Sequence, residues 1–141
     1  MTDLERARSV FCRDRFAAET GCVIDEVGEG YARCSLTLED RHRNALGAPM
    51  GGALFTLADF AFAVASNFDR DVFVSTAADV HFLSAARGSC LTAEARQIRS
   101  GRRTCLFSVT ITDDLGAQAA YITITGMKTM TREKAKRPAE K

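Results

Sequence analysis

Asp59 is the single ionisable side chain in a long, alanine-rich segment that runs from residue 51 to residue 67. The segment lacks proline and predicts a helix, and apolar residues occupy almost its whole circumference. Helical spacing places Asp59 on a narrow stripe of small and polar residues, which comprises Gly52, Thr56, Ala63 and Ser66. Such a carboxylate is either a structural group hydrogen-bonded to a neighbouring loop or an acid-base group, and the pattern alone leaves both open.

The predicted helix begins with two glycines, Gly51 and Gly52, directly after Met50. The first turn of a helix has backbone N–H groups without acceptors, and glycine lets another molecule approach them closely. Such an end can bind an oxyanion, although a glycine pair can also serve only as a tight turn. N–H groups facing a carbonyl oxygen, with a carboxylate near its carbon or an adjacent water, would be the two parts of acyl-transfer chemistry.

Gly51 and Asp59 are separated by eight residues, which corresponds to about 12 Å along a helix axis. Both groups therefore cannot lie within about 3 Å of one substrate carbonyl. If the helices of two subunits run antiparallel across a two-fold axis, Gly51 of one chain meets Asp59 of the other. The sequence thus predicts a homo-oligomer, a dimer or a tetramer, with sites shared between subunits and an inactive monomer.

The segments around this helix predict an α+β fold. Residues 4–19 predict one amphipathic helix capped at Gly21, and residues 39–50 predict a loop. Alternating patterns predict a hairpin before the central helix and an antiparallel meander after it, with strands at residues 22–27, 31–38, 72–83, 90–98, 104–112 and 117–127. An antiparallel sheet wrapped around one long central helix is the architecture of a hotdog domain.

Composition narrows the possible partners and compartments. The 141 residues contain 19 Lys and Arg against 18 Asp and Glu, a balance that gives no reason to expect nucleic acid as a partner. No apolar run is long enough to cross a membrane, and the first residues, which lack a basic stretch followed by an apolar run, are not expected to be a secretory signal. Five cysteines without a C-x-x-C pair argue against disulfides or a zinc ribbon and favour the reducing cytoplasm. Residues 1–130 are expected to form one domain, followed by a charged, mobile tail at residues 131–141.

The stretch from Asn44 through Met50-Gly51-Gly52 to Asp59 and Asn67 resembles the hotdog thioesterases of the phenylacetate-degradation type. The resemblance continues through residues 79–86 and covers most of residues 20–128. It implies hydrolysis of an aromatic or short- to medium-chain acyl-CoA to a free acid and CoA, with neither metal nor other cofactor. It also implies that Asp59 is the general base or nucleophile and that Gly51 supplies the N–H that polarises the thioester carbonyl.

The same resemblance implies roles for the residues around these two. Asn44 would orient the water or the carbonyl, and a hydroxyl on the strand after the helix would place the water, with Ser75 the first choice and Thr76 the second. Gly52 and Met50 would contact the substrate.

Met50 departs from the family, which commonly has histidine before the glycine pair. That departure motivates an alternative, a non-hydrolytic acyl-CoA-binding protein. A hydratase or dehydratase ranks lower, because His42 and His81 are the only histidines and neither adjoins the helix. The two histidines lack metal-ligand spacing and are expected to be structural or surface residues.

Overall fold

The computed structural model describes residues 1–135. Its elements, in chain order, are α1 (Asp3–Phe11), α2 (Arg15–Thr20), β1 (Cys22–Gly28), β2 (Tyr31–Thr37), the 3-10 turn η1 (Asp40–His42), α3 (Gly51–Asn67), β3 (Val72–Phe82), β4 (Cys90–Ser100), β5 (Thr104–Asp113), β6 (Gln118–Met130) and α4 (Arg132–Ala135).

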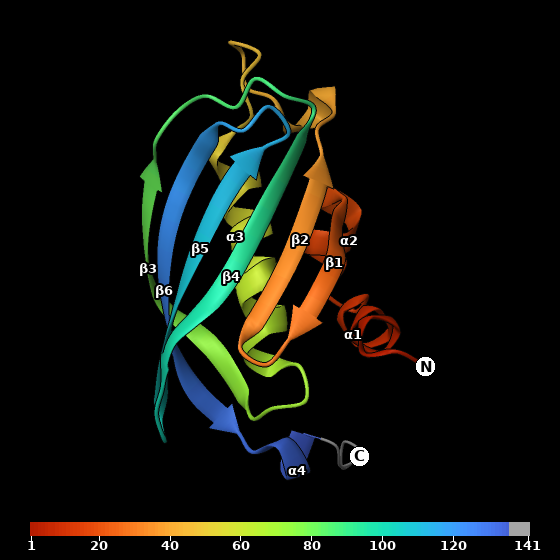
Figure 1. Ribbon diagram of the computed structural model, residues 1–141, viewed down its shortest axis with the longest axis vertical. Helices are drawn as coiled ribbons and strands as arrows, with labels where there is room; N and C mark the ends of the chain where they lie inside the picture. Colours follow the sequence, from red (N-terminus) through yellow and green to blue (C-terminus); the bar gives the residue numbers. More distant parts are fainter. Residues whose placement is uncertain (136–141) are drawn as a thin grey trace.

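All six strands form one antiparallel sheet in the order β1-β2-β4-β5-β6-β3. The sheet curves around α3, and α1 and α2 lie beside the β1 edge (Figure 1). Alternate residues of β4, β5 and β6 are fully buried against α3, and the ring of Phe62 on the helix meets Phe107 of β5 edge to face at 5.4 Å. The predicted hotdog architecture is confirmed.

Helix α3 begins at Gly51 and ends at Asn67, as the sequence predicts. It packs against β1, β2, β3, β4, β5 and β6, which explains why apolar residues occupy most of its circumference. Asn67 then ties the helix to the strand that follows: its Nδ2 donates to the carbonyl of Phe73 at 3.1 Å, and its Oδ1 accepts from the Phe73 N–H at 2.7 Å.

The N-terminal region differs from the single helix predicted over residues 4–19. The structure has two helices, α1 and α2, because the buried stripe of α1 cannot continue. Ala7 and Phe11 are buried, and the next positions on that face would be Asp14 and Arg15. A break at residues 12–14 turns these charges outward and buries Ala17 instead.

The β1–β2 hairpin follows the sequence prediction closely. Gly21 ends α2 with a left-handed φ of 109°, and the hairpin turns at Gly30 with a φ of 64°. Both values lie in the region that glycine adopts without strain. The predicted cap and hairpin are therefore confirmed.

The predicted meander holds for β4, β5 and β6 but is wrong for β3. β3 pairs with β6 at the edge of the sheet, and β4 pairs with β2. Arg87 and Gly88 belong to a loop at residues 83–89 that crosses from β3 to β4. Asp113 anchors this loop by accepting from the backbone N–H groups of Arg87 at 2.9 Å and Gly88 at 3.2 Å.

Strand β3 contains an irregularity at Thr76. The pairing with β6 runs from Ser75 opposite Gly126 directly to Ala77 opposite Thr125, so Thr76 is an extra residue, and its hydroxyl donates to the Thr125 carbonyl at 3.2 Å. A bulge of this kind shifts the alternation of side chains by one residue. Ser75 consequently faces α3 before the bulge, and Val80 packs against the core after it.

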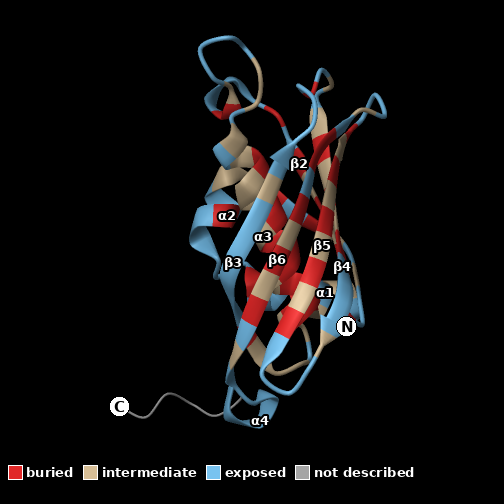
Figure 2. Cartoon of the chain, turned by 90° about the vertical axis from the view of Figure 1, so that its left-hand side faces the viewer, coloured by how far each residue is buried: buried red, intermediate tan, exposed pale blue. Residues whose placement is uncertain are grey.

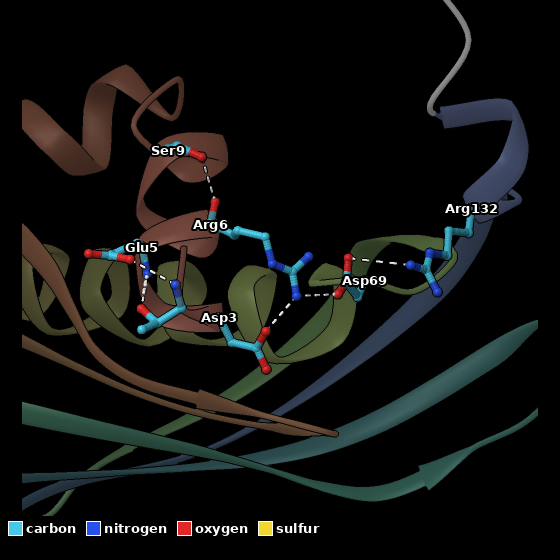
Figure 3. Close-up of polar contacts among 7 residues, drawn as sticks. Asp3, Glu5, Arg6, Ser9, Asp69 and Arg132 are labelled. Atoms are coloured by element: carbon cyan, nitrogen blue, oxygen red, sulfur yellow. Dashed lines mark hydrogen bonds and ion pairs between the residues drawn. The ribbon is translucent and has the colours of Figure 1, made fainter.

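The two ends of the described chain meet at the turn between α3 and β3. Arg6 of α1 and Arg132 of α4 both form ion pairs with Asp69, at 2.9 and 3.5 Å (Figure 3). The Arg132 N–H also donates to Asp71 at 2.7 Å. The mobile tail expected from residue 131 therefore starts with a helical turn, α4, and residues 136–141 lie outside the described residues.

Candidate active site

Asp59 lies half-buried in the middle of α3, between β3 on one side and the start of α2 on the other. Burial raises the pKa of its carboxyl group above the ordinary value, a hydrogen bond from the Ser75 side chain lowers that pKa, and the charge of Asp14 raises it. A raised pKa brings a carboxylate closer to the range in which it accepts and returns protons near neutral pH. The structure thus brings Asp59 and Ser75 together.

The predicted stripe of small and polar residues is largely the uncovered side of α3. Gly52 is exposed, and Thr56, Asp59 and Ala63 are partly exposed, in a helix whose other faces are mostly buried. Ser66 was predicted on this stripe but is buried, because the C-terminal turn of α3 is enclosed and its hydroxyl bonds to Asn67. Thr56 donates its hydroxyl to the carbonyl of Gly52 at 2.8 Å, within the helix.

The start of α3 has the N–H groups that the sequence indicated. Within residues 1–135, the backbone N–H groups of Gly51 and Gly52 have no hydrogen-bond acceptor. The two positions differ in their surroundings. A Cβ at Gly51 would stand 2.9 Å from the ring of Phe82, whereas a Cβ at Gly52 would meet nothing within 4 Å. The Cβ side of Gly51 therefore lies against the ring of Phe82, and that of Gly52 faces open space.

Asn44 lies in the exposed loop before α3. Its Oδ1 accepts from the backbone N–H groups of Leu46 at 2.9 Å and Ala48 at 3.1 Å, so this oxygen shapes the loop. Its Nδ2 makes no hydrogen bond within residues 1–135. Thr76, the second choice for placing water, instead uses its hydroxyl on the β6 backbone.

Met50 lines a pocket of about 340 Å³ with Phe16 and His42. His42 is buried, and both of its ring nitrogens are engaged: Nδ1 accepts from the Glu39 N–H at 3.0 Å, and Nε2 lies 2.6 Å from the Thr20 carbonyl. His42 is thus a structural residue that ties the loop to α2. The sequence predicted either a structural or a surface role for it.

Three residues near the site escape sequence reasoning. Asp14 and Phe16 line a groove of about 410 Å³ beside Asp59, and Phe82 covers Gly51. Asp14 and Phe16 are 45 and 43 residues before Asp59, and the pattern around them indicated only the exposed side of a continuous helix. The resemblance at residues 79–86 included Phe82, but it did not predict which residue the ring contacts.

Among residues 1–135, no group of three or more His, Cys, Asp and Glu side chains could hold a metal ion. All five cysteines, which lie within that range, are free thiols. The described helices include none that is both long and apolar enough to cross a membrane.

One long helix wrapped by a six-stranded antiparallel sheet, with a half-buried aspartate on the least covered side of that helix, defines the chain as a hotdog-fold protein. A family model described as a domain of unknown function, DUF4442, matches residues 10–127. The Escherichia coli K12 acyl-coenzyme A thioesterase PaaI is 32% identical over 108 residues, which cover 76% of this chain and 77% of that protein. The chain belongs to the hotdog-fold acyl-CoA thioesterase family of the phenylacetate-degradation type.

Two further comparisons agree with this assignment. The structure of E. coli PaaI superimposes with a TM-score of 0.85 at 26% identity and covers 92% of this chain and 94% of that one. A relative from Archaeoglobus fulgidus is 35% identical over 85 residues, or 60% of this chain. That match spans only 55% of the length of the A. fulgidus protein.

Proposed function

We propose that this chain hydrolyses an acyl-CoA thioester to a carboxylic acid and free CoA. The observation that carries the proposal is Asp59, a half-buried carboxylate on the uncovered stripe of an otherwise enclosed helix, with the Ser75 side chain beside it. Membership of a family of thioester hydrolases supports it. The substrate is an aromatic or short- to medium-chain acyl-CoA, because phenylalanine rings dominate the apolar part of the groove beside Asp59.

In the proposed reaction, ionised Asp59 either takes a proton from water as the water attacks the thioester carbon, or attacks that carbon itself. The carbonyl oxygen becomes negatively charged and is stabilised by the Gly51 N–H. When the carbon–sulfur bond breaks, the CoA sulfur leaves with the bonding electrons and is protonated to the thiol. In the nucleophile route, water then hydrolyses the acyl-aspartate to regenerate Asp59.

The neighbouring residues have supporting roles. Ser75, whose side chain lies beside the Asp59 carboxylate, also positions the attacking water. Asn44 orients the water or the carbonyl through its Nδ2. Gly52 allows close approach of the substrate, and Met50 contributes an apolar contact near the thioester. Thr76 contributes to substrate binding through the local shape of β3, because its hydroxyl is engaged with Thr125.

Each site is proposed to combine Gly51 of one subunit with Asp59 of its partner, since about 12 Å of helix separates them in one chain. The β3 edge supports this arrangement. Within residues 1–135 no strand pairs with its outer side, and residues 74–79 are exposed on both faces (Figure 2). A long exposed edge strand is a surface that pairs readily with another chain. A dimer, alone or within a tetramer, would place two α3 helices side by side.

The first experiment measures thiol release from a panel of aromatic and aliphatic acyl-CoA esters. Asp59→Asn keeps the shape of the side chain but cannot accept a proton, and it is expected to lower kcat by at least ~100-fold. Glu29→Gln is the matched control, because Glu29 is exposed at the β1–β2 turn, beside residues 68–70 at the far end of α3. An Asp59→Asn protein that turns over like wild type contradicts the proposal.

Subunit sharing has its own test, in which two inactive variants are refolded together. Asp59→Asn and Gly51→Pro carry their defects in different halves of the proposed shared site. In a random mixture, half of the dimers are mixed, and each mixed dimer has one intact site, so about a quarter of wild-type activity returns. A mixture that stays inactive, with subunit exchange verified by a mass tag, refutes sharing.

A non-hydrolytic acyl-CoA-binding protein is the second candidate, favoured by Met50 at the position where the family commonly has histidine. It predicts saturable binding of acyl-CoA without thiol release. Met50→His distinguishes the two candidates: a change of less than about threefold is expected of an active hydrolase, because the backbone N–H rather than the imidazole contacts the oxyanion. Hydrolysis that appears only in Met50→His favours the binding protein. The cytoplasm remains the proposed compartment, given five free thiols.

A further inference from the structure

The groove beside Asp59 has two walls from distant parts of the sequence. Residues 14–17, at the start of α2, form one wall, and α3 forms the other with Phe55, Asp59 and Phe60. Figure 2 shows α2 beside α3, on the side where the helix is least covered. The groove holds about 410 Å³, enough for the acyl part of a small thioester.

Phe16 is the most exposed apolar side chain of this groove, with 75% of its surface accessible. It lines both this groove and the pocket beside Met50, so its ring stands between the two ends of the uncovered stripe. Burial of such an exposed aromatic ring under an apolar ligand is favourable, because it removes apolar surface from water. Phe16 is therefore placed to contact the acyl group.

Asp14 gives the same wall a negative charge. It occupies the N-cap position of α2, yet its side chain makes no capping hydrogen bond. In the described part of the chain its carboxylate has no hydrogen-bond or ion-pair partner, and its charge acts on Asp59. Asp is among the preferred N-cap residues, and such a cap normally contributes about 1 kcal/mol to stability. Here the carboxylate is directed to the groove instead.

No unpaired cation offsets this charge among the described residues that line the groove. Arg15 is the one basic residue there, and it pairs with Glu19 at 2.7 Å. The groove thus combines aromatic rings with two carboxylates. A neutral acyl group would meet the rings, whereas an acyl group ending in a carboxylate would bring a third negative charge into a partly desolvated space.

We propose that residues 14–17 form a wall of the acyl site and that Asp14 selects neutral acyl thioesters against those that carry a terminal carboxylate. This inference rests on the proposed thioesterase function and names its substrate class. Repulsion between like charges across a partly wet groove disfavours the acidic substrate by roughly fivefold to tenfold. Phe16 adds the apolar contact that favours the neutral one.

The test compares butyryl-CoA with succinyl-CoA, which have acyl chains of equal length and differ by one terminal carboxylate. The measured quantity is the ratio of kcat/KM for the two substrates. Asp14→Asn is expected to lower the preference for butyryl-CoA by roughly fivefold to tenfold, with less change at high salt. A shift in the pKa of Asp59 would change both rates together, so the ratio isolates selection.

Glu29→Gln is the matched control. It makes the same change of charge at the β1–β2 turn, beside residues 68–70 at the far end of α3, and is expected to leave the ratio unchanged. Phe16→Ala is expected to raise KM for phenylacetyl-CoA by at least about threefold. Its control is Val10→Ala, which removes an exposed apolar side chain of α1 outside the groove.

An unchanged substrate ratio in Asp14→Asn, in a protein that melts like wild type, overturns the inference. If wild type releases no thiol from any ester, the proposed hydrolysis fails by itself. The same variants are then compared by calorimetric Kd for butyryl-CoA and succinyl-CoA. An Asp14-dependent Kd ratio supports selection by the groove, and an Asp14-independent ratio refutes it.

Discussion

The ring of Phe82 lies 2.9 Å from the point where a Cβ on Gly51 would stand. Any side chain at position 51 must therefore push that ring aside, and the ring can move because Phe82 is 59% exposed. Gly51→Ala is expected to fold normally and to lose less than about tenfold in kcat, because it keeps the backbone N–H.

Gly51→Pro adds the same Cβ but removes the N–H, and proline is tolerated at the first position of a helix. Met50 already has the extended backbone, with ψ at 142°, that a residue before proline requires. Loss of one oxyanion donor is expected to lower kcat by about 100-fold or more. Equal activity of the alanine and proline variants in a thiol-release assay would exclude the Gly51 N–H from catalysis.

Ser75 is expected to set the acid side of the pH profile, through its effect on the pKa of Asp59. Its hydrogen bond lowers the pKa of Asp59, so Ser75→Ala is expected to raise that pKa further. Since Asp59 must be ionised to act as a base or nucleophile, the acid limb of kcat/KM against pH should move to higher pH. Ser108→Ala, on the outer face of β5, serves as the control. A limb that moves to lower pH contradicts the assignment.

Ionised Asp59 is also expected to lower the stability of the folded protein at neutral pH. Its folded-state pKa is raised, so the folded chain binds more protons than the unfolded chain between the unfolded and folded pKa values. Stability then decreases as pH rises through that interval. Asp59→Asn cannot ionise and should melt above wild type at neutral pH, with the difference shrinking toward pH values below about 4. A lower Tm for the variant at neutral pH would falsify this expectation.

His42 is expected to matter for stability rather than turnover. Both ring nitrogens are bonded and the ring is buried, so His42→Ala removes two hydrogen bonds and leaves a cavity. The expected loss is about 2–4 kcal/mol in the free energy of unfolding, measured with denaturant. kcat measured well below the melting temperature should change less than about threefold, and a selective loss of kcat would point to a catalytic part for the imidazole.

The sequence predicted the bounds of α3 and the face of the helix on which Asp59 lies, because both follow from residues close together in the sequence. The bounds Gly51 and Asn67, the glycine pair and the stripe around Asp59 follow from spacing within one helix. The contact between Asp59 and Ser75 required one further assumption, the face of β3 that meets the helix, which the family resemblance supplied.

Tertiary contacts account for what the sequence could not predict. The split of the N-terminal helix depends on burying Ala17 instead of Asp14, and the outcome brings Asp14 to the groove. The position of β3 depends on a loop held by Asp113, whose carboxylate collects backbone N–H groups from two turns. No periodicity within either segment encodes such contacts.

The extra residue at Thr76 makes β3 sensitive to changes in length. Before the bulge Ser75 faces the helix, and after it Val80 and Phe82 do so. Deleting Thr76 would restore simple alternation and keep Val80 and Phe82 toward α3, whereas inserting one residue after the bulge would turn the exposed Asp79 and His81 toward α3 in place of their apolar neighbours. Single-residue insertions should therefore be tolerated in the exposed loop at residues 44–47 but lethal to folding after the bulge in this strand, whichever side chain is inserted.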